Sequence, residues 1–145
     1  MATPPTASAP PNSYMEDPSG PIERMAWAMF TIGGQRHGWD DEAGREVGVG
    51  KDIRLRGRQV TAWRERKGHR LSLEMVTGAW DPPVRTLVIG SGVYGRITVP
   101  KKVLRAIRAR GIAEVVVERT PDACRRYNVL LREGRDVALL AHGTC

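Results

Sequence analysis

The sequence has little of the residue types that mark secreted or membrane proteins. It contains two cysteines, Cys124 and Cys145, in 145 residues, which is too few for a disulfide-stabilised scaffold. No apolar run approaches the roughly 20 residues that cross a bilayer. The N-terminus has no basic segment followed by an apolar stretch, and the first arginine is Arg24, so we expect neither a secretory signal nor an Arg-rich presequence. We therefore expect a cytoplasmic protein without membrane contact.

Phenylalanine is almost absent, and this restricts how the core is built. With one Phe, the core has to come from aliphatic side chains and the four tryptophans. A length of 145 residues suits one domain with one core.

Basic residues exceed acidic ones, with a formal net charge of +7. Such a balance favours acidic partners and says nothing about the fold. The sequence has no zinc finger, no RNA-recognition consensus and no interleaving of arginines with aromatic residues. A nucleic acid is therefore not an expected partner.

Proline is concentrated in residues 1–21, which hold six of the ten prolines together with Ala, Ser and Thr. Such a segment has too little apolar surface to offset the entropy cost of ordering it. We predict a disordered Pro-rich tail over 1–21 and one folded domain over 22–145.

The first half of the predicted domain favours strands and turns. Residues 25–32 alternate apolar with small residues and end at Gly33-Gly34, which is typical of a strand entering a hairpin. The polar, Gly-rich stretch 37–50 predicts a loop. Two further strands are expected at 52–55 and 59–64, and these segments together predict an antiparallel β unit on the N-terminal side.

The second half predicts alternating helices and strands. Residues 71–76 fit a strand or a short helix ended by Gly78, and we favour the helix. Continuous apolar runs predict strands buried on both faces, at 87–89, 115–117 and 137–140. Helices are expected where Pro opens and Gly closes an amphipathic segment, at 100–110 and at 121–133 with Thr120 as the cap. This order indicates an α/β fold in which helices cover a parallel or mixed sheet.

A literal Gly-x-Gly-x-x-Gly, formed by Gly90, Gly92 and Gly95, follows the first buried strand. In a dinucleotide site the helix opens within these glycines, so that its N-terminus meets the pyrophosphate. Here residues 96–99 intervene before the predicted helix, and the chain is too short for a second mononucleotide-binding half. We therefore expect no cofactor, and interpret the glycines as a tight turn or as backbone amides around a small anion.

The best polar cluster lies at residues 63–69. Arg64 has the chemistry to hold a carboxylate or phosphate, and His69 could transfer a proton near neutral pH. The alternative is an exposed strand end followed by a basic turn.

The two cysteines and Asn128 are further candidates. Cys145 could act as a nucleophile, and with His142 it has the spacing of half a metal site; no second pair completes that site, so we expect no metal. Cys124 lies beside the apolar face of its helix and is expected in the core. Asn128 either touches a ligand or, as we favour, caps a neighbouring loop.

Several short motifs occur in an order that resembles the Mth-938-like domain family. They cover about residues 25–145, and they are Lys51-Asp52, Trp63-Arg64-Glu65 with His69, Thr86–Gly92, Val99-Pro100, Arg110–Ile112, Thr120–Cys124, Tyr127-Asn128, Arg132–Arg135 and His142–Cys145.

The resemblance implies a three-layer single α/β domain around a mixed β-sheet. It implies no established catalytic activity, because known members look like protein-interaction or assembly factors. It also implies a ligand-binding pocket near four positions of this sequence, Arg64, His69, Gly90 and Gly92, to which Asn128 and Cys145 are further candidates.

Two functions remain open on these grounds. The first is a small interaction or assembly module with a protein partner, in which an exposed strand edge is also compatible with a homodimer. The second is a small enzyme or anionic-ligand-binding protein of a specialised bacterial pathway. In that case Arg64 would hold an acidic small molecule, and His69 or Cys145 would be the catalytic group.

Overall fold

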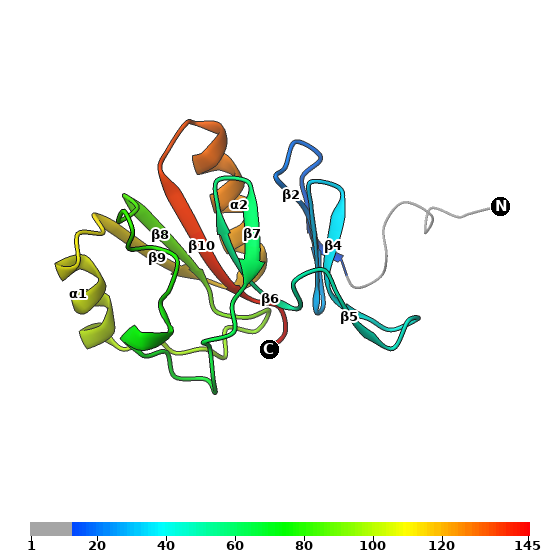
Figure 1. Ribbon diagram of the computed structural model, residues 1–145, viewed down its shortest axis with the longest axis horizontal. Coiled ribbons are helices and arrows are strands. Elements are labelled where there is room, and N and C mark those ends of the chain that lie inside the picture. Colours follow the sequence, from blue (N-terminus) through cyan, green and yellow to red (C-terminus); the bar gives the residue numbers. More distant parts are fainter. Residues whose placement is uncertain (1–12) are drawn as a thin grey trace.

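The computed structural model describes residues 13–145, which form two five-stranded sheets and two α-helices (Figure 1). The first, here called the N-terminal sheet, is an antiparallel meander in which each strand pairs with the next in sequence. Its strands are β1 (Ser13–Glu16), β2 (Ile22–Ala26), β3 (Met29–Ile32), β4 (Gln35–Asp40) and β5 (Arg45–Val47).

The second sheet, here called the mixed sheet, has the order β7-β6-β10-β8-β9. Its strands are β6 (Asp52–Arg56), β7 (Gln59–Ala62), β8 (Thr86–Gly90), β9 (Glu114–Glu118) and β10 (Val137–His142). The central strand β10 runs antiparallel to β6 and parallel to β8, and β8 runs parallel to β9. Every residue of β8 and β10 is buried, as their continuous apolar runs predict for strands covered on both faces. The same prediction for 115–117 is wrong, because β9 is an edge strand without a buried residue, and its Val117 is 38% exposed.

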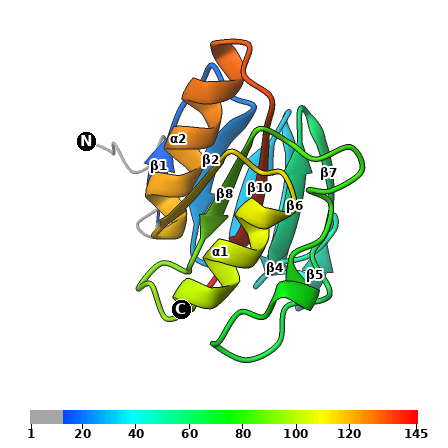
Figure 2. The same cartoon turned by 90° about the vertical axis from the view of Figure 1, so that its left-hand side faces the viewer.

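The layers follow from where the two helices pack. Helix α1 (Lys101–Ala109) covers one face of the mixed sheet, and α2 (Thr120–Arg132) covers the other (Figures 1 and 2). Helix α2 also contacts β1 and β2, and the N-terminal sheet packs beside it on the same face of the mixed sheet. The predicted α/β domain with three layers around a mixed sheet is confirmed, with the N-terminal sheet sharing the layer of α2.

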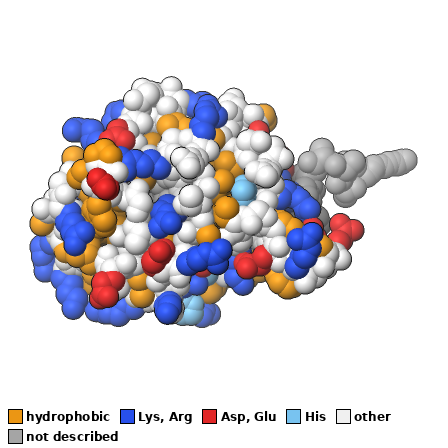
Figure 3. Space-filling view, viewed as in Figure 1, with side chains coloured by type: hydrophobic (Ala, Val, Ile, Leu, Met, Phe, Trp, Pro, Cys, Tyr) orange, Lys and Arg blue, Asp and Glu red, His pale blue; other side chains and the backbone are white. Residues whose placement is uncertain are grey.

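Helix α1 is amphipathic in the way its sequence predicts. It buries Val103 and Ile107 against the mixed sheet, and its exposed basic residues are Lys101, Lys102, Arg105 and Arg108. Figure 3 shows Lys and Arg side chains gathered over the end of the molecule that α1 forms. Within residues 13–145, neither helix is long and apolar enough to cross a membrane.

The N-terminal sheet corrects two predictions. Residues 25–32 are parts of two strands rather than one, because the chain reverses at Trp27 and Ala28, where Ala28 adopts a φ of 59°. The stretch 37–50 contains β4 and β5 instead of a loop, since antiparallel pairing with β3 orders this polar hairpin. Polar residues are compatible with such strands because one face of an antiparallel sheet can meet water.

The structure corrects the C-terminal part of the tail that the composition predicted for 1–21. Residues 13–16 form β1, which pairs with β2 and buries Met15 in the core. Partner strands and α2 supply the apolar contacts that the segment lacks by itself. Residues 1–12 lie outside the described residues, so the prediction for them stays a prediction.

Three smaller expectations also change. Strands β6 and β7 form the predicted hairpin, but they belong to the mixed sheet rather than to the N-terminal unit, because β6 pairs with β10. The helix expected at 71–76 is a single 3₁₀ turn, Leu73–Met75. Thr120 lies within α2 and its hydroxyl is not used as a helix cap.

Asn128 joins α2 to the chain that enters the N-terminal sheet. It is fully buried, and its amide accepts a hydrogen bond from the Ile22 N–H at 2.9 Å and donates to the Ile22 carbonyl at 2.7 Å. The same Nδ2 donates to Asp17 at 3.0 Å. This geometry matches the capping role that we favoured, because the side chain replaces the backbone partners that Ile22 lacks.

We predict that Asn128→Ala lowers the free energy of unfolding by about 2–4 kcal/mol, because it leaves the buried Ile22 N–H and C=O unpaired. Urea denaturation of the full chain measures the change. The matched control is Val129→Ala, the next residue of α2, whose side chain is 45% exposed, and this variant should unfold near the wild-type midpoint. Equal midpoints for Asn128→Ala and wild type would contradict the view that the hydrogen bonds between Asn128 and the Ile22 backbone stabilise the fold.

Candidate functional site

The candidate site lies where β8 and β10 end at one edge of the mixed sheet. Because these strands are parallel, their carboxyl ends meet there, which is the usual position of sites in α/β proteins. The turn from Gly90 to Arg96 follows β8, and the segment His142–Cys145 contains the end of β10. The two lie side by side: the Val93 N–H donates to the Thr144 carbonyl at 2.7 Å.

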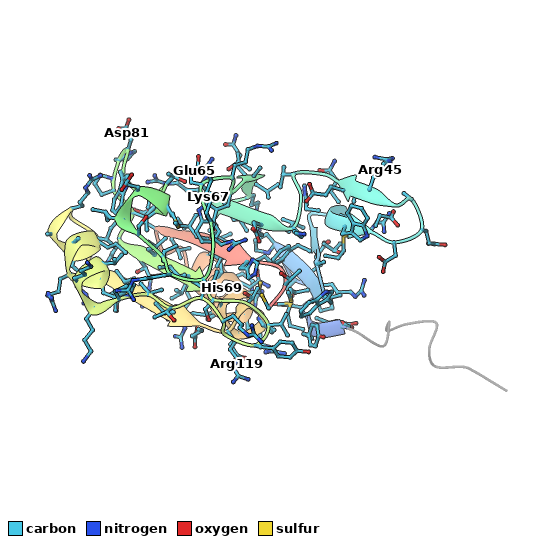
Figure 4. All side chains as sticks on the ribbon, turned by 90° about the horizontal axis from the view of Figure 1, so that it is seen from below. Arg45, Glu65, Lys67, His69, Asp81 and Arg119 are labelled. Atoms are coloured by element: carbon cyan, nitrogen blue, oxygen red, sulfur yellow. The ribbon has the colours of Figure 1, made fainter. Side chains whose placement is uncertain are left out.

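Cys145 lies between two imidazoles at this edge. Its Sγ is 3.5 Å from Nε2 of His142 and 3.5 Å from Nε2 of His69. His142 is 3% exposed, while His69 is exposed and comes from the loop after β7. Figure 4, which views the molecule from below, shows His69 between Glu65 and Lys67 on one side and Arg119 on the other.

The His142 ring is oriented by Asp52, the first residue of β6. Its Nδ1 lies 2.7 Å from Oδ1 of Asp52. A carboxylate only accepts hydrogen bonds, so Nδ1 carries a proton, and in the neutral form of the ring Nε2 is an acceptor. Both the Cys145 thiol and the Thr144 hydroxyl, at 3.1 Å, can donate to that nitrogen.

Asp52 is held in its charged form by its neighbours. Its Oδ2 accepts from Arg66 Nε at 3.0 Å, and its Oδ1 accepts from the Gly143 N–H at 3.2 Å. Burial alone would raise the pKa of this carboxyl, but the hydrogen bonds and positive charges of His142 and Arg66 outweigh burial and lower the pKa. We call Cys145, His142, Asp52 and His69 the thiol–histidine cluster.

The glycines of the turn allow this close packing. A Cβ on Gly92, whose φ is +106°, would lie 2.3 Å from the Cys145 carbonyl carbon. A Cβ on Gly90 would lie 2.9 Å from the hydroxyl of Thr120, and that hydroxyl accepts from the Gly92 N–H and donates to the His142 carbonyl. Gly90 and Gly92 therefore position His142 and Cys145 through the backbone.

The turn does not resemble a phosphate cradle. The N–H groups of Ser91, Gly92 and Val93 are bonded to protein acceptors, and α1 begins only at Lys101. The amides that would meet a pyrophosphate are thus already used, and the helix N-terminus is separated from the glycines.

The structure brings together only some of the predicted site residues. His69, Gly92 and Cys145 meet at the thiol–histidine cluster. Arg64 is exposed and lines a recess of about 270 Å³ with Lys51, Asp52 and Arg66. This recess shares Asp52 with the cluster, but His69 is not part of its lining. Asn128 lies two turns along α2 from Thr120, about 12 Å away along the helix axis.

A second surface feature adjoins the cluster and was not predicted. Trp27, Trp39 and Tyr94, here called the aromatic patch, are 37%, 42% and 61% exposed. Trp27 and Trp39 line a recess of about 520 Å³ together with Thr144, Lys51 and Asp41, and the rings of Trp27 and Tyr94 are 5.7 Å apart. Within residues 13–145, no group of three His, Cys, Asp or Glu side chains is placed to hold a metal ion.

Comparison with known proteins supports the resemblance found in the motifs. The model of the family described as "Protein of unknown function (DUF498/DUF598)" matches residues 22–142. The chain belongs to this family. A solved structure that is similar to this chain is a Bordetella pertussis protein described as a Mth938-like domain, with a TM-score of 0.54, 17% identity and coverage of 89% of this chain and 90% of that one.

Two further relatives show how far the similarity extends. A conserved hypothetical protein of Pyrococcus horikoshii shares the fold with a TM-score of 0.64 and 18% identity, over 86% of this chain and 98% of that one. The NADH dehydrogenase [ubiquinone] 1 alpha subcomplex assembly factor 3 of Bos taurus is 46% identical over 55 residues, 38% of this chain. That match spans 29% of the curated relative's length.

We predict that Asp52→Asn lowers stability at pH 7 by about 1–3 kcal/mol, because it removes a charge-assisted acceptor. The lowered pKa of Asp52 gives the sign of the pH dependence. The contribution is present above the unfolded pKa of about 3.9 and is lost as pH falls through the lower folded pKa. We expect urea denaturation at several pH values between 7 and 2.5 to show that the difference in free energy of unfolding between variant and wild type disappears below about pH 4.

The control for this series is Glu42→Gln, since Glu42 is an exposed residue of the β4–β5 hairpin. It should follow the wild-type curve at every pH. If the free energy of unfolding of Asp52→Asn stays below that of wild type by a constant amount down to pH 2.5, the carboxylate charge is not what stabilises the site.

Proposed function

We propose that the chain is a protein-interaction module of the assembly type, acting in the cytoplasm, and that the aromatic patch is its binding surface. The observation that carries this proposal is the exposure of Trp27 and Trp39, which line one recess, with the exposed Tyr94 beside Trp27. Exposed Trp and Tyr are the residues that most often dominate the energy of protein interfaces. The lining residues Lys51 and Asp41 give the recess a polar rim, as interfaces commonly have.

Two further points support an interaction role. The patch is formed on a rigid base, because the Ala28 N–H donates to the Gly143 carbonyl and the Trp39 N–H donates to the Ala28 carbonyl, both at 2.8 Å. A patch that is fixed before binding loses little entropy on association. The partly matching relative is named as an assembly factor, which agrees with a function exercised through protein partners.

We predict that Trp39→Ala weakens partner binding at least tenfold, since truncating a central interface tryptophan costs about 2 kcal/mol or more. The partner is first identified by cross-linking of tagged full-length chain in its native cells. The dissociation constant is then measured by calorimetry with purified components. Sedimentation of the chain alone shows whether the partner is a second copy.

The control is Val129→Ala, another exposed apolar residue, on α2. It should leave the dissociation constant unchanged. The proposal fails if the identified partner binds Trp39→Ala, Trp27→Ala and wild type with the same affinity.

A second function is favoured by the recess around Arg64. Lys51, Arg64 and Arg66 line it together with the acidic Glu46 and Asp52. Because Arg66 is paired with Asp52, Lys51 and Arg64 outnumber the remaining acid, and the recess offers positive charge to a small anionic ligand. We predict that phosphate raises the thermal unfolding midpoint of wild type through binding by Arg64, and that Arg64→Ala abolishes this rise. Lys67→Ala, in the same loop, should keep it. A similar rise in all three proteins would indicate a general salt effect.

A further inference from the structure

The thiol–histidine cluster contains more than a structural hydrogen-bond network needs. A carboxylate orients an imidazole, and the free nitrogen of that imidazole faces a thiol. A nucleophile, a base within hydrogen-bond reach and a third group that orients the base are the parts by which proteins activate a thiol. We propose that Cys145 is a nucleophilic thiol that exchanges with small disulfides, with His142 as its base and Asp52 as the positioning residue.

The position of Cys145 fits such a reaction. Its side chain is half-buried rather than enclosed, so a small disulfide can reach Sγ. His69 approaches the same sulfur from the solvent side at 3.5 Å. Two imidazoles beside one sulfur provide two sites that can accept the thiol proton and then stabilise the thiolate.

Cys124 shows the opposite environment in the same chain. It is fully buried on α2, and burial raises the pKa of its thiol. A buried neutral thiol is inert. Cys124 therefore cannot act as a second, resolving thiol, and because the sequence has only these two cysteines, a disulfide formed on Cys145 joins the protein to the external thiol.

The neighbouring donors distinguish disulfide exchange from attack on a carbonyl. Acyl transfer requires N–H groups aimed at the developing oxyanion. The amides of Tyr94 and Arg96 instead donate to the main-chain oxygen of Cys145 itself, and that of Gly143 donates to Asp52. Attack on sulfur needs only a thiolate and a proton for the leaving thiol, and the cluster supplies both.

Nε2 of His142 takes the Sγ proton, and the thiolate attacks one sulfur of a small disulfide such as oxidised glutathione. A new S–S bond to Cys145 forms while the S–S bond of glutathione breaks. The departing thiolate takes the proton from His142, so Cys145 is oxidised to a mixed disulfide and one glutathione thiol is produced.

The test follows formation of the glutathione adduct by intact-protein mass spectrometry, with the full chain and oxidised glutathione under anaerobic conditions. At pH 6.5 wild type should react at least about tenfold faster than a free cysteine peptide, whose reactive thiolate fraction is small there. Cys145→Ser should form no adduct, and Cys124→Ala should react as wild type. A wild-type rate equal to that of the free peptide would overturn the proposal without any variant.

The dependence of the reaction rate on pH distinguishes the role of His142 as the base from that of Asp52 as the positioning residue. In His142→Gln the rate should be about tenfold lower at pH 6.5 and should rise with pH as for a free thiol. Asp52→Asn should shift the profile in the same direction by a smaller factor, which a loss of stability alone would not do. If both profiles match wild type in folded protein, the assignment of base and positioning residue is wrong.

The aromatic patch supplies the remaining control. Trp39→Ala should lose partner affinity but form the adduct at the wild-type rate. The exchange reaction and the proposed interaction function can thus fail separately.

Discussion

The hydrogen bond between Asp52 and His142 is the interaction on which this edge of the molecule depends. It ties the first residue of β6 to the last residue of β10, at the point where the chain leaves the mixed sheet. From there Gly143 passes so close to β6 that a Cβ would lie 2.1 Å from the Lys51 carbonyl oxygen. Its carbonyl accepts from Ala28 of the N-terminal sheet. The four residues His142–Cys145 therefore join both sheets to the glycine turn.

This joint explains why the candidate site and the aromatic patch are neighbours. Trp27 belongs to the same tight turn as Ala28, whose backbone bond to Gly143 fixes the turn against the site. Tyr94 belongs to the turn whose amides hold the Cys145 carbonyl. Residues that bind the segment His142–Cys145 through their backbones thus present their side chains to solvent, so the two surface features share one scaffold.

The architecture could be predicted from the sequence where the signal is local. Continuous apolar runs correctly indicated β8, β9 and β10, and Pro and Gly correctly bounded α1 and α2. The prediction failed for β1, β4 and β5, because those strands are polar or proline-flanked and are ordered by pairing with neighbours. Which strands pair depends on the whole fold, so the sequence of a single segment does not predict its partner strand.

The site was predictable only in part for a related reason. His69 and Cys145 stood out by residue type, and Gly92 stood out by its motif. Asp52 and His142 each belonged to a short motif of the family resemblance, and His142 also formed half of a metal site, but nothing in the sequence joined the two residues. They are 90 residues apart in sequence, and what brings them together is the antiparallel register of β6 and β10, in which they are paired. That register depends on the whole sheet.

The free-energy cost of keeping Asp52 charged indicates that the thiol–histidine cluster does more than hold β6 and β10 together. Removing a carboxylate from water is costly, and a buried charged pair is often no more stabilising than apolar residues of the same volume. The Asp52 side chain is 14% exposed, and holding it charged requires two cationic or donor partners, His142 and Arg66. Aliphatic side chains could form the contact between β6 and β10 equally well. They do so elsewhere along β10, where Leu139 and Leu140 are buried. A charge kept beside a half-buried thiol is better explained by control of an imidazole's proton than by the stability of the fold.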